Sequence, residues 1–308
     1  MMVRIFILPV FLFLIITSEA QQLPQFTYFT YNYLQYNPAV TGATPCLELK
    51  FGYRRQWRGL PDGPTTGFAN LHGKFRKKKN NFMGLGGVVE SDKAGPFVYT
   101  SAQLLYAYHM KLAKKYQLSA GVGVGFSQYR IDYSSMTLEF QESDPALFDN
   151  VNSFVFPGIS AGLWLYREDR FYGISVRNLA NRPVKGTIDT RLQPHYSFAY
   201  GYATRVSDEM VFKPAFLLNY VGRSKPSLDA QFVLEYKQKV SMGLAARTGH
   251  GVSALLKLSM LKYVTLGYAY DLTANKMRYA SASTHEIVIG IRACAEKDRY
   301  DVPCAAYD

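Results

Sequence analysis

Histidines are the side chains of this sequence best suited to acid–base chemistry near neutral pH. The chain has five of them, His72, His109, His195, His250 and His285. A hydrolase could use His195, His250 or His285 with Asp189 or Asp271, but the spacing identifies no nucleophile to complete such a site. The sequence has no H-x-x-x-H metal pair and no phosphate-binding loop. We therefore expect no enzymatic activity, and no catalytic, cofactor-binding or metal-binding residues.

Two clusters of cationic side chains are candidates for binding another protein. The first is Arg54, Arg55, Trp57 and Arg58. It is followed by a stretch up to Pro64 in which glycines favour a turn and prolines stiffen it. The second is Arg76, Lys77, Lys78 and Lys79. The first cluster is either a cargo contact or an aromatic anchor in a rim loop. The second is either a docking surface for an acidic partner or anionic headgroups, or a solvated basic rim.

The first twenty residues have the features of an export signal. Arg4 precedes an apolar run from Ile5 to Ile16, and small residues follow at Ser18-Glu19-Ala20. This pattern predicts a cleaved signal peptide over residues 1–20, with the mature chain beginning near Gln21. The first cysteine, Cys46, lies too far from the apolar run for lipid attachment.

Composition limits the class of protein that these residues can belong to. The chain has 308 residues, of which 48% are hydrophobic and 15% aromatic, with a formal net charge of +12. Disorder is excluded by the apolar content, and three cysteines are too few for a disulfide scaffold. After Ile16 no stretch reaches the roughly 18 consecutive apolar residues of a transmembrane helix.

Alternation of period two is the dominant pattern of the mature chain. From Leu47 to Arg54, apolar residues alternate with polar residues or glycine, and Gly121 to Gly125 alternates glycine with valine. About fourteen such segments follow one another between residues 46 and 293. They predict an all-β protein, a transmembrane antiparallel β-barrel with outward residues such as Leu104 and Tyr106 facing lipid. A secreted β-sandwich is the alternative.

The lengths of the connections predict the orientation of the barrel. Four long ones, Trp57 to Pro64, Asp132 to Phe154, Leu179 to Arg191 and Leu272 to Ser283, would be extracellular loops. The short turns, including Arg76 to Asn80, would lie in the periplasm together with both ends of the mature chain.

The division into segments follows from the strands. Residues 1–20 form the signal peptide, 21–45 a periplasmic arm or plug, 46–293 the barrel and 294–308 a periplasmic tail. The arm either caps the barrel base or docks a partner. The acidic stretch from Asp132 to Phe154 could cover the mouth of the barrel or enter its lumen.

Several motifs in order along the chain resemble one known family. They are Tyr31-Asn32-Tyr33-Leu34-Gln35-Tyr36-Asn37-Pro38-Ala39-Val40-Thr41-Gly42, Tyr53-Arg54-Arg55-Gln56-Trp57, Gly63-Pro64-Thr65-Thr66, Ala107-Tyr108-His109, Gly162-Leu163-Trp164-Leu165-Tyr166, Pro194-His195-Tyr196, Phe212-Lys213-Pro214, Gly267-Tyr268-Ala269-Tyr270-Asp271 and Ser283-Thr284-His285-Glu286. Together they make the chain similar to the PorP/SprF family of the type IX secretion system, over nearly the whole mature sequence.

The resemblance implies a function that the alternation does not show. It implies a non-enzymatic barrel in the outer membrane of a Gram-negative bacterium, without a cofactor, that assists secretion or surface retention of cargo. The implied partners are cargo with a C-terminal type IX sorting domain, including gliding adhesins, and periplasmic components such as an OmpA-like peptidoglycan-binding protein. Nucleic acid is not an expected partner. The alternative function is a passive porin or uptake channel with an open lumen.

The cysteines give a prediction that depends on the barrel alone. Cys46 opens the first strand and Cys294 follows the last, so closure would make them neighbours at the periplasmic rim. The periplasm is oxidising, which favours a Cys46–Cys294 disulfide with Cys304 free. A Cys294–Cys304 bond and three reduced thiols are the alternatives.

Overall fold

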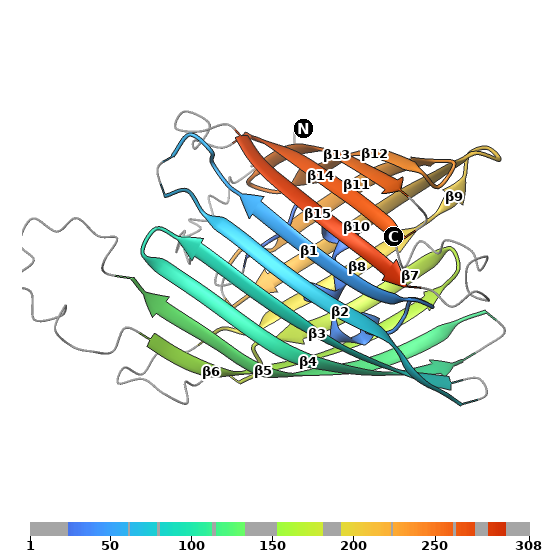
Figure 1. The fold of residues 1–308 in the computed structure, drawn as a ribbon, viewed down its shortest axis with the longest axis horizontal. Helices are drawn as coiled ribbons and strands as arrows, with labels where there is room; N and C mark the ends of the chain where they lie inside the picture. Colours follow the sequence, from blue (N-terminus) through green and yellow to red (C-terminus); the bar gives the residue numbers. More distant parts are fainter. Residues whose placement is uncertain are drawn as a thin grey trace, which may run out of the picture.

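The protein is a closed antiparallel β-barrel of fourteen long strands in its described part (Figure 1). The computed structural model describes residues 24–60, 62–78, 81–112, 115–132, 153–180, 192–222, 224–260, 263–274 and 283–293. The strands are β1 (Leu47–Arg55), β2 (Thr65–Lys78), β3 (Asn81–Ala94), β4 (Phe97–Lys111), β5 (Gln117–Ile131), β6 (Ser153–Arg167), β7 (Arg170–Arg177), β8 (His195–Tyr202), β9 (Thr204–Arg205), β10 (Met210–Val221), β11 (Ser227–Tyr236), β12 (Val240–Arg247), β13 (Gly251–Met260), β14 (Val264–Thr273) and β15 (Ser283–Ala293). The predicted fold class is confirmed.

With the exception of β8 and β9, each strand pairs with its neighbours in the chain, and β1 closes the barrel against β15. The two-residue strand β9 continues β8 after an interruption at Ala203, since both pair with β10. The interrupted pair β8 and β9 therefore occupies one position in the barrel wall. This is why fifteen strand segments form a wall of fourteen.

The two faces of the wall have opposite chemistry, as the alternation predicts. Leu104 on the outer face is 73% exposed, whereas Leu105, the next residue, is 3% exposed. On β1 the apolar side chain of Phe51 is exposed, while the charged side chains of Glu48 and Lys50 are buried. An apolar exterior with charges inside is the arrangement that a membrane barrel requires.

The connections differ in length between the two ends of the barrel. The short-turn end has residues 168–169, 206–209 and 237–239, while the long-connection end has 56–64, 132–152 and 178–194. This asymmetry matches the expected pattern of short turns and long loops. Among the described residues, no helix is long and apolar enough to cross a membrane.

Residues 24–45, which we call the plug, lie inside the barrel (Figure 1). They form three short 3-10 helices, η1 (Phe29–Tyr31), η2 (Tyr33–Gln35) and η3 (Pro38–Val40), and nearly all their side chains are buried. The plug begins beside Arg54 at the long-connection end and ends at the short-turn end, where β1 starts.

This path differs from the expectation that both ends of the mature chain lie at the short-turn end. The first described residues are at the opposite end from Ala293, because the plug runs through the lumen. The reason is the high aromatic content of residues 26–36, which are buried against the inner wall instead of remaining in water. The predicted signal peptide 1–20, nearly all of the stretch from Asp132 to Phe154 and the tail 294–308 lie outside the described residues.

Candidate functional site

Aromatic packing holds the middle of the plug against the wall. Tyr33 lies 5.3 Å from Trp164 and 4.9 Å from Phe171 between ring centroids. Trp164 and Phe171 stack on each other at 4.7 Å, and both are buried. Such large buried rings contribute most of the apolar contact area of a core. The Gly162 to Tyr166 motif therefore belongs to the plug interface.

Glycines on the inner face make room for the plug backbone. A Cβ atom at Gly121 would collide with the backbone of Ala39, and one at Gly84 would collide with the carbonyl of Thr41. A Cβ at Gly162 would meet the side chain of Asn37. The glycine–valine alternation around Gly121 is thus a strand whose inner face admits η3 at close range.

Neutral polar groups fix the second half of the plug. Asn37 caps η3 by accepting the Ala39 N–H at 2.9 Å and donates to the carbonyl of Leu163 at 3.0 Å. Ser119 donates to the carbonyl of Ala39 at 2.7 Å, and His109 Nε2 donates to that of Thr41 at 2.8 Å. These bonds satisfy backbone groups that would otherwise be buried without partners.

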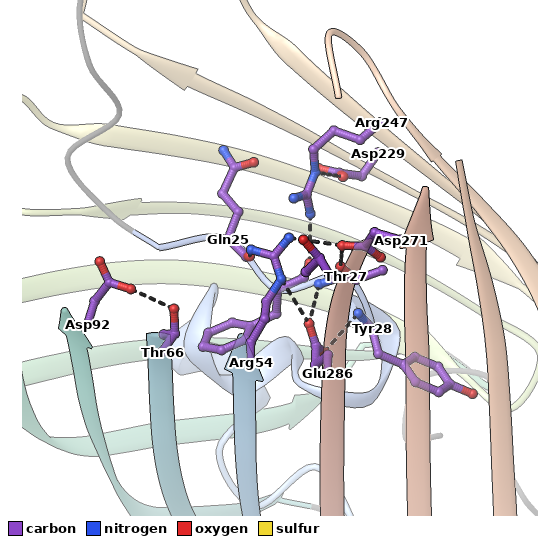
Figure 2. A network of polar contacts seen from close by, with 12 residues as sticks. Gln25, Thr27, Tyr28, Arg54, Thr66, Asp92, Asp229, Arg247, Asp271 and Glu286 are labelled. Atoms are coloured by element: carbon purple, nitrogen blue, oxygen red, sulfur yellow. Dashed lines mark hydrogen bonds and ion pairs between the residues drawn. The ribbon is translucent and has the colours of Figure 1, made fainter. Parts of the chain in front are cut away.

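Charged groups fix the first residues of the plug at the long-connection end (Figure 2). The Glu286 carboxylate accepts the backbone N–H groups of Thr27 at 2.6 Å and Tyr28 at 3.0 Å. Arg54 donates to the carbonyl of Gln25 at 2.8 Å and lies 3.6 Å from Glu286. A buried carboxylate and a buried guanidinium here compensate each other and bind the backbone.

Four further wall residues complete this network. Arg247 donates to the carbonyl of Phe26 at 2.7 Å and forms an ion pair with Asp229. Gln231 donates to the carbonyl of Thr27. Asp271 accepts the Thr27 hydroxyl at 2.7 Å and pairs with Arg54 at 3.0 Å (Figure 2). The donors and acceptors come from β1, β11, β12, β14 and β15, so only barrel closure brings them together.

A small cavity that is partly open to solvent adjoins this network. Thr27, Arg54, Arg247 and Trp57 are among the residues that line it. Asp271 also faces it, so the cavity is polar where it meets the plug.

A second charged cluster lies at the short-turn end. Glu48 is 3.2 Å from Lys50 Nζ and 3.3 Å from His72 Nε2, and it also pairs with Arg292. His72 Nδ1 accepts the backbone N–H of Gly42 at 3.1 Å. This cluster therefore fixes the end of the plug near the seam between β1 and β15.

The predicted cluster from Arg54 to Arg58 is divided by the structure. Arg54 points inward and is buried, whereas Arg55 is exposed on the outer face. Trp57 has a positive φ of 48° and donates its backbone N–H to Thr284 at 3.2 Å. The exposed Arg58 donates its backbone N–H to the carbonyl of Ser283 at 3.0 Å. The loop is thus fastened to β15, and partner binding by these residues stays a prediction.

The second predicted cluster can be placed only in part. Arg76, Lys77 and Lys78 belong by their backbone to the end of β2, and Lys79 lies outside the described residues. Cys46 takes part in a disulfide. Its partner cysteine is not among the described residues, and neither is Cys294. Binding by the basic cluster and the Cys46–Cys294 pairing both stay predictions.

The histidines considered for hydrolysis are separated from one another. His250 and Asp271 line the same cavity, but Asp271 is bonded to Thr27 and Arg54. His285 lies on the outer face and bonds the Tyr268 hydroxyl at 2.7 Å. In the part of the chain that the structure describes, no three His, Cys, Asp or Glu side chains are placed to hold a metal ion.

Sequence reasoning missed the residues that hold the start of the plug. They are Asp229, Gln231, Arg247 and Glu286. Each is a polar residue at an inward position of an alternating strand, and that pattern alone could have identified them as lumen residues. Their common target could not be identified, because it depends on where residues 24–45 run.

Comparison with known proteins supports the barrel and identifies the family. In structure, the chain resembles the toluene transporter TbuX of Ralstonia pickettii, with a TM-score of 0.52, 11% identity, and coverage of 84% of this chain and 92% of that one. It also resembles the toluene transporter TodX of Pseudomonas putida, with a TM-score of 0.54, 10% identity, and coverage of 84% and 92%. At these identities the likeness concerns the fold. No curated protein matches the sequence.

One family model matches most of the chain. Residues 18–291 match the family described as type IX secretion system membrane protein PorP/SprF. The matched range includes the plug, the wall of the barrel and all the residues that bind the start of the plug. The barrel and the family together support a location in the outer membrane. The chain therefore belongs to the PorP/SprF family of type IX secretion system membrane proteins.

Proposed function

We propose that this protein is a non-enzymatic outer-membrane component of the type IX secretion system that assists secretion or surface retention of cargo through protein–protein contacts. The observation that carries the proposal is the filled lumen. Residues 26–44 are almost entirely buried inside the barrel and are bonded to its wall from both ends. A barrel in this state is better suited to presenting surfaces to partners than to conducting solutes.

We expect each end of the barrel to bind one class of partner. Cargo with a C-terminal sorting domain would contact the long-connection end, where Trp57 lines the cavity and Arg58 is exposed. A periplasmic secretion-system protein, such as an OmpA-like peptidoglycan-binding protein, would contact the short-turn end, where the run from Arg76 to Lys79 supplies positive charge. Lipid would surround the apolar outer face.

The test combines co-purification with a secretion assay. A strain lacking the protein should lose type IX cargo from the cell surface or the medium, and affinity-tagged protein should co-purify with cargo and a periplasmic component. W57A/R58A should reduce the amount of cargo recovered, whereas R205A, an exposed arginine at the other end, should not. Normal cargo export in the deletion strain, together with a large single-channel conductance of the purified barrel, would refute the proposal in favour of a channel.

A further inference from the structure

The start of the plug is held through its backbone. Residues 24–28 form no helix, and wall side chains bind three successive carbonyls, those of Gln25, Phe26 and Thr27. Glu286 binds two successive N–H groups, those of Thr27 and Tyr28. In contrast, the rest of the plug uses some of its backbone groups within its own 3-10 turns.

Backbone recognition leaves the sequence of the bound segment largely free. Among the side chains of residues 25–28, that of Thr27 bonds to these wall groups, through its hydroxyl and Asp271. Phe26 adds one apolar contact, because its ring lies 4.7 Å from that of Phe68. The site therefore selects a short non-helical peptide with two adjacent free N–H groups and an aromatic residue just before them.

The site also has hydrogen-bonding capacity that the plug does not use. Asp229 Oδ2 and Asp271 Oδ1 are buried acceptor atoms without a hydrogen-bond partner, and both residues line the cavity at the long-connection end. Asp229 is 4% exposed. Two unpaired carboxylate oxygens beside a backbone-binding site suit further N–H donors of a bound peptide.

We propose that Arg54, Gln231, Arg247 and Glu286 form a peptide-backbone clamp that exchanges residues 25–28 of this chain for a non-helical segment of an exported protein. The incoming segment would enter through the cavity at the long-connection end. Cleavage near Gln21 would leave the start of the plug tethered only through η1, so that it can leave the clamp without opening the barrel. The inference rests on the proposed function, since it names the kind of cargo element that is bound.

The probe is a fluorescein-labelled peptide of residues 24–31, measured by fluorescence polarisation against the purified mature protein in detergent. F26G/Y28G removes two buried rings from the internal segment and keeps every clamp residue. We expect saturable binding to this variant at least tenfold tighter than to the wild type, where the internal segment competes. Heat-modifiable migration in electrophoresis shows that the variant barrel is folded.

The chemistry of the clamp is tested by two changes. A peptide methylated on the nitrogens of Thr27 and Tyr28 keeps all side chains but lacks both N–H groups, and it should bind at least tenfold more weakly. E286Q added to F26G/Y28G should weaken binding similarly, because an amide leaves one of the two N–H groups without an acceptor. S175A, which removes the bond to the carbonyl of Tyr36 outside the clamp, is the matched control and should not change binding.

Equal binding of the methylated peptide, or no binding to folded F26G/Y28G, would overturn the clamp. If that variant does not fold, wild-type protein is treated with a peptide carrying photoreactive benzoylphenylalanine at the position of Phe26. Crosslinks beside Phe68 support the clamp, and crosslinks elsewhere or none refute it. Binding does not depend on secretion, so peptide binding found together with normal cargo export in the deletion strain and a large conductance of the purified barrel would refute the proposed function and leave the clamp standing.

Discussion

At the level of single residues, charged side chains are buried inside this barrel, whereas the interior of a soluble protein is mainly apolar. Arg54 and Glu286 are 5% and 1% exposed, and each is satisfied by an opposite charge and by the plug backbone. Removing one member of such a set strands a buried charge, which is more damaging than the loss of a surface pair. Ion pairs in the turns are exposed to water and contribute less.

The turn between β6 and β7 offers a pH-dependent prediction. Hydrogen bonds from Arg167, opposed by desolvation and assisted by Arg170, lower the pKa of Asp169 to about 2. The carboxyl of an unfolded chain has a pKa near 3.9, so this pair stabilises the folded protein above about pH 4 and loses its effect as the pH falls through about 2.

D169N should therefore lower the denaturation midpoint in urea at pH 7 by a small amount, less than about 1 kcal/mol in free energy of unfolding, because the pair is partly exposed. The difference from wild type should shrink as the pH falls from 4 to 2. D208N, in the exposed turn 206–209, is the matched control. A difference that persists at pH 2 would show that Asp169 acts through something other than its charge.

At the level of secondary-structure elements, the plug packs closely against the inner faces of β3, β5 and β6 because glycines there have no side chain. Gly84, Gly121 and Gly162 each lie where a Cβ atom would meet the plug. Outward glycines have no such constraint. At Gly87 the nearest atom to an added Cβ is the carbonyl of Gln103 at 3.5 Å, an ordinary contact.

G121V should force η3 away from β5, because the atoms in its path are the Ala39 backbone and not a flexible side chain. We expect a loss of about 1–3 kcal/mol in stability, the usual range for overpacking, and a larger conductance in planar bilayers as the plug shifts. G87V should leave both quantities near wild type. Equal effects of the two substitutions would show that strand propensity, not the plug, explains the result.

At the scale of the whole molecule, the barrel has two distinct ends and one seam. The plug connects the ends, since its first residues bind the wall beside Arg54 and its last contact the cluster around Glu48. The seam between β1 and β15 joins the first strand to the last, with Leu47 opposite Ala293. Orientation in the membrane and closure of the seam can each be tested directly.

Orientation is tested by single cysteines at the two ends. A membrane-impermeant maleimide should label R58C on intact cells, because the loop 56–64 belongs to the long-connection end. S207C, in the turn before β10, should react only after the outer membrane has been permeabilised. The unsubstituted protein gives the background from its native cysteines. Labelling in the opposite order would invert the proposed topology.

The seam is tested by peptide mapping without reduction. Continuing the register of Leu47 with Ala293 by one residue pairs Cys46 with Cys294, and neighbouring positions of this kind satisfy the Cα separation of a disulfide. We expect a crosslinked peptide pair containing Cys46 and Cys294. Recovery of Cys46 bonded to Cys304, or alkylated before reduction, would disprove the seam disulfide.

The alternating pattern of the sequence is sufficient to predict the wall of this protein. In a strand, successive side chains face opposite sides, so the alternation from Leu47 to Arg54 fixes which residues face outward without any knowledge of their neighbours. The same local rule predicted the number of strands and the alternation of connection lengths. The family could be inferred from the ordered motifs, and the match over residues 18–291 confirms it.

The contacts made by the inward residues depend on the tertiary structure. Glu286 and Arg247 lie on strands far from residues 25–28 in sequence, and no local pattern shows that all of them meet. The path of the plug was not predictable for the same reason. A segment without alternation has no face to assign, and its position depends on wall groups as far apart in the chain as Trp164 on β6 and Glu286 on β15, which line one lumen only after the barrel has closed.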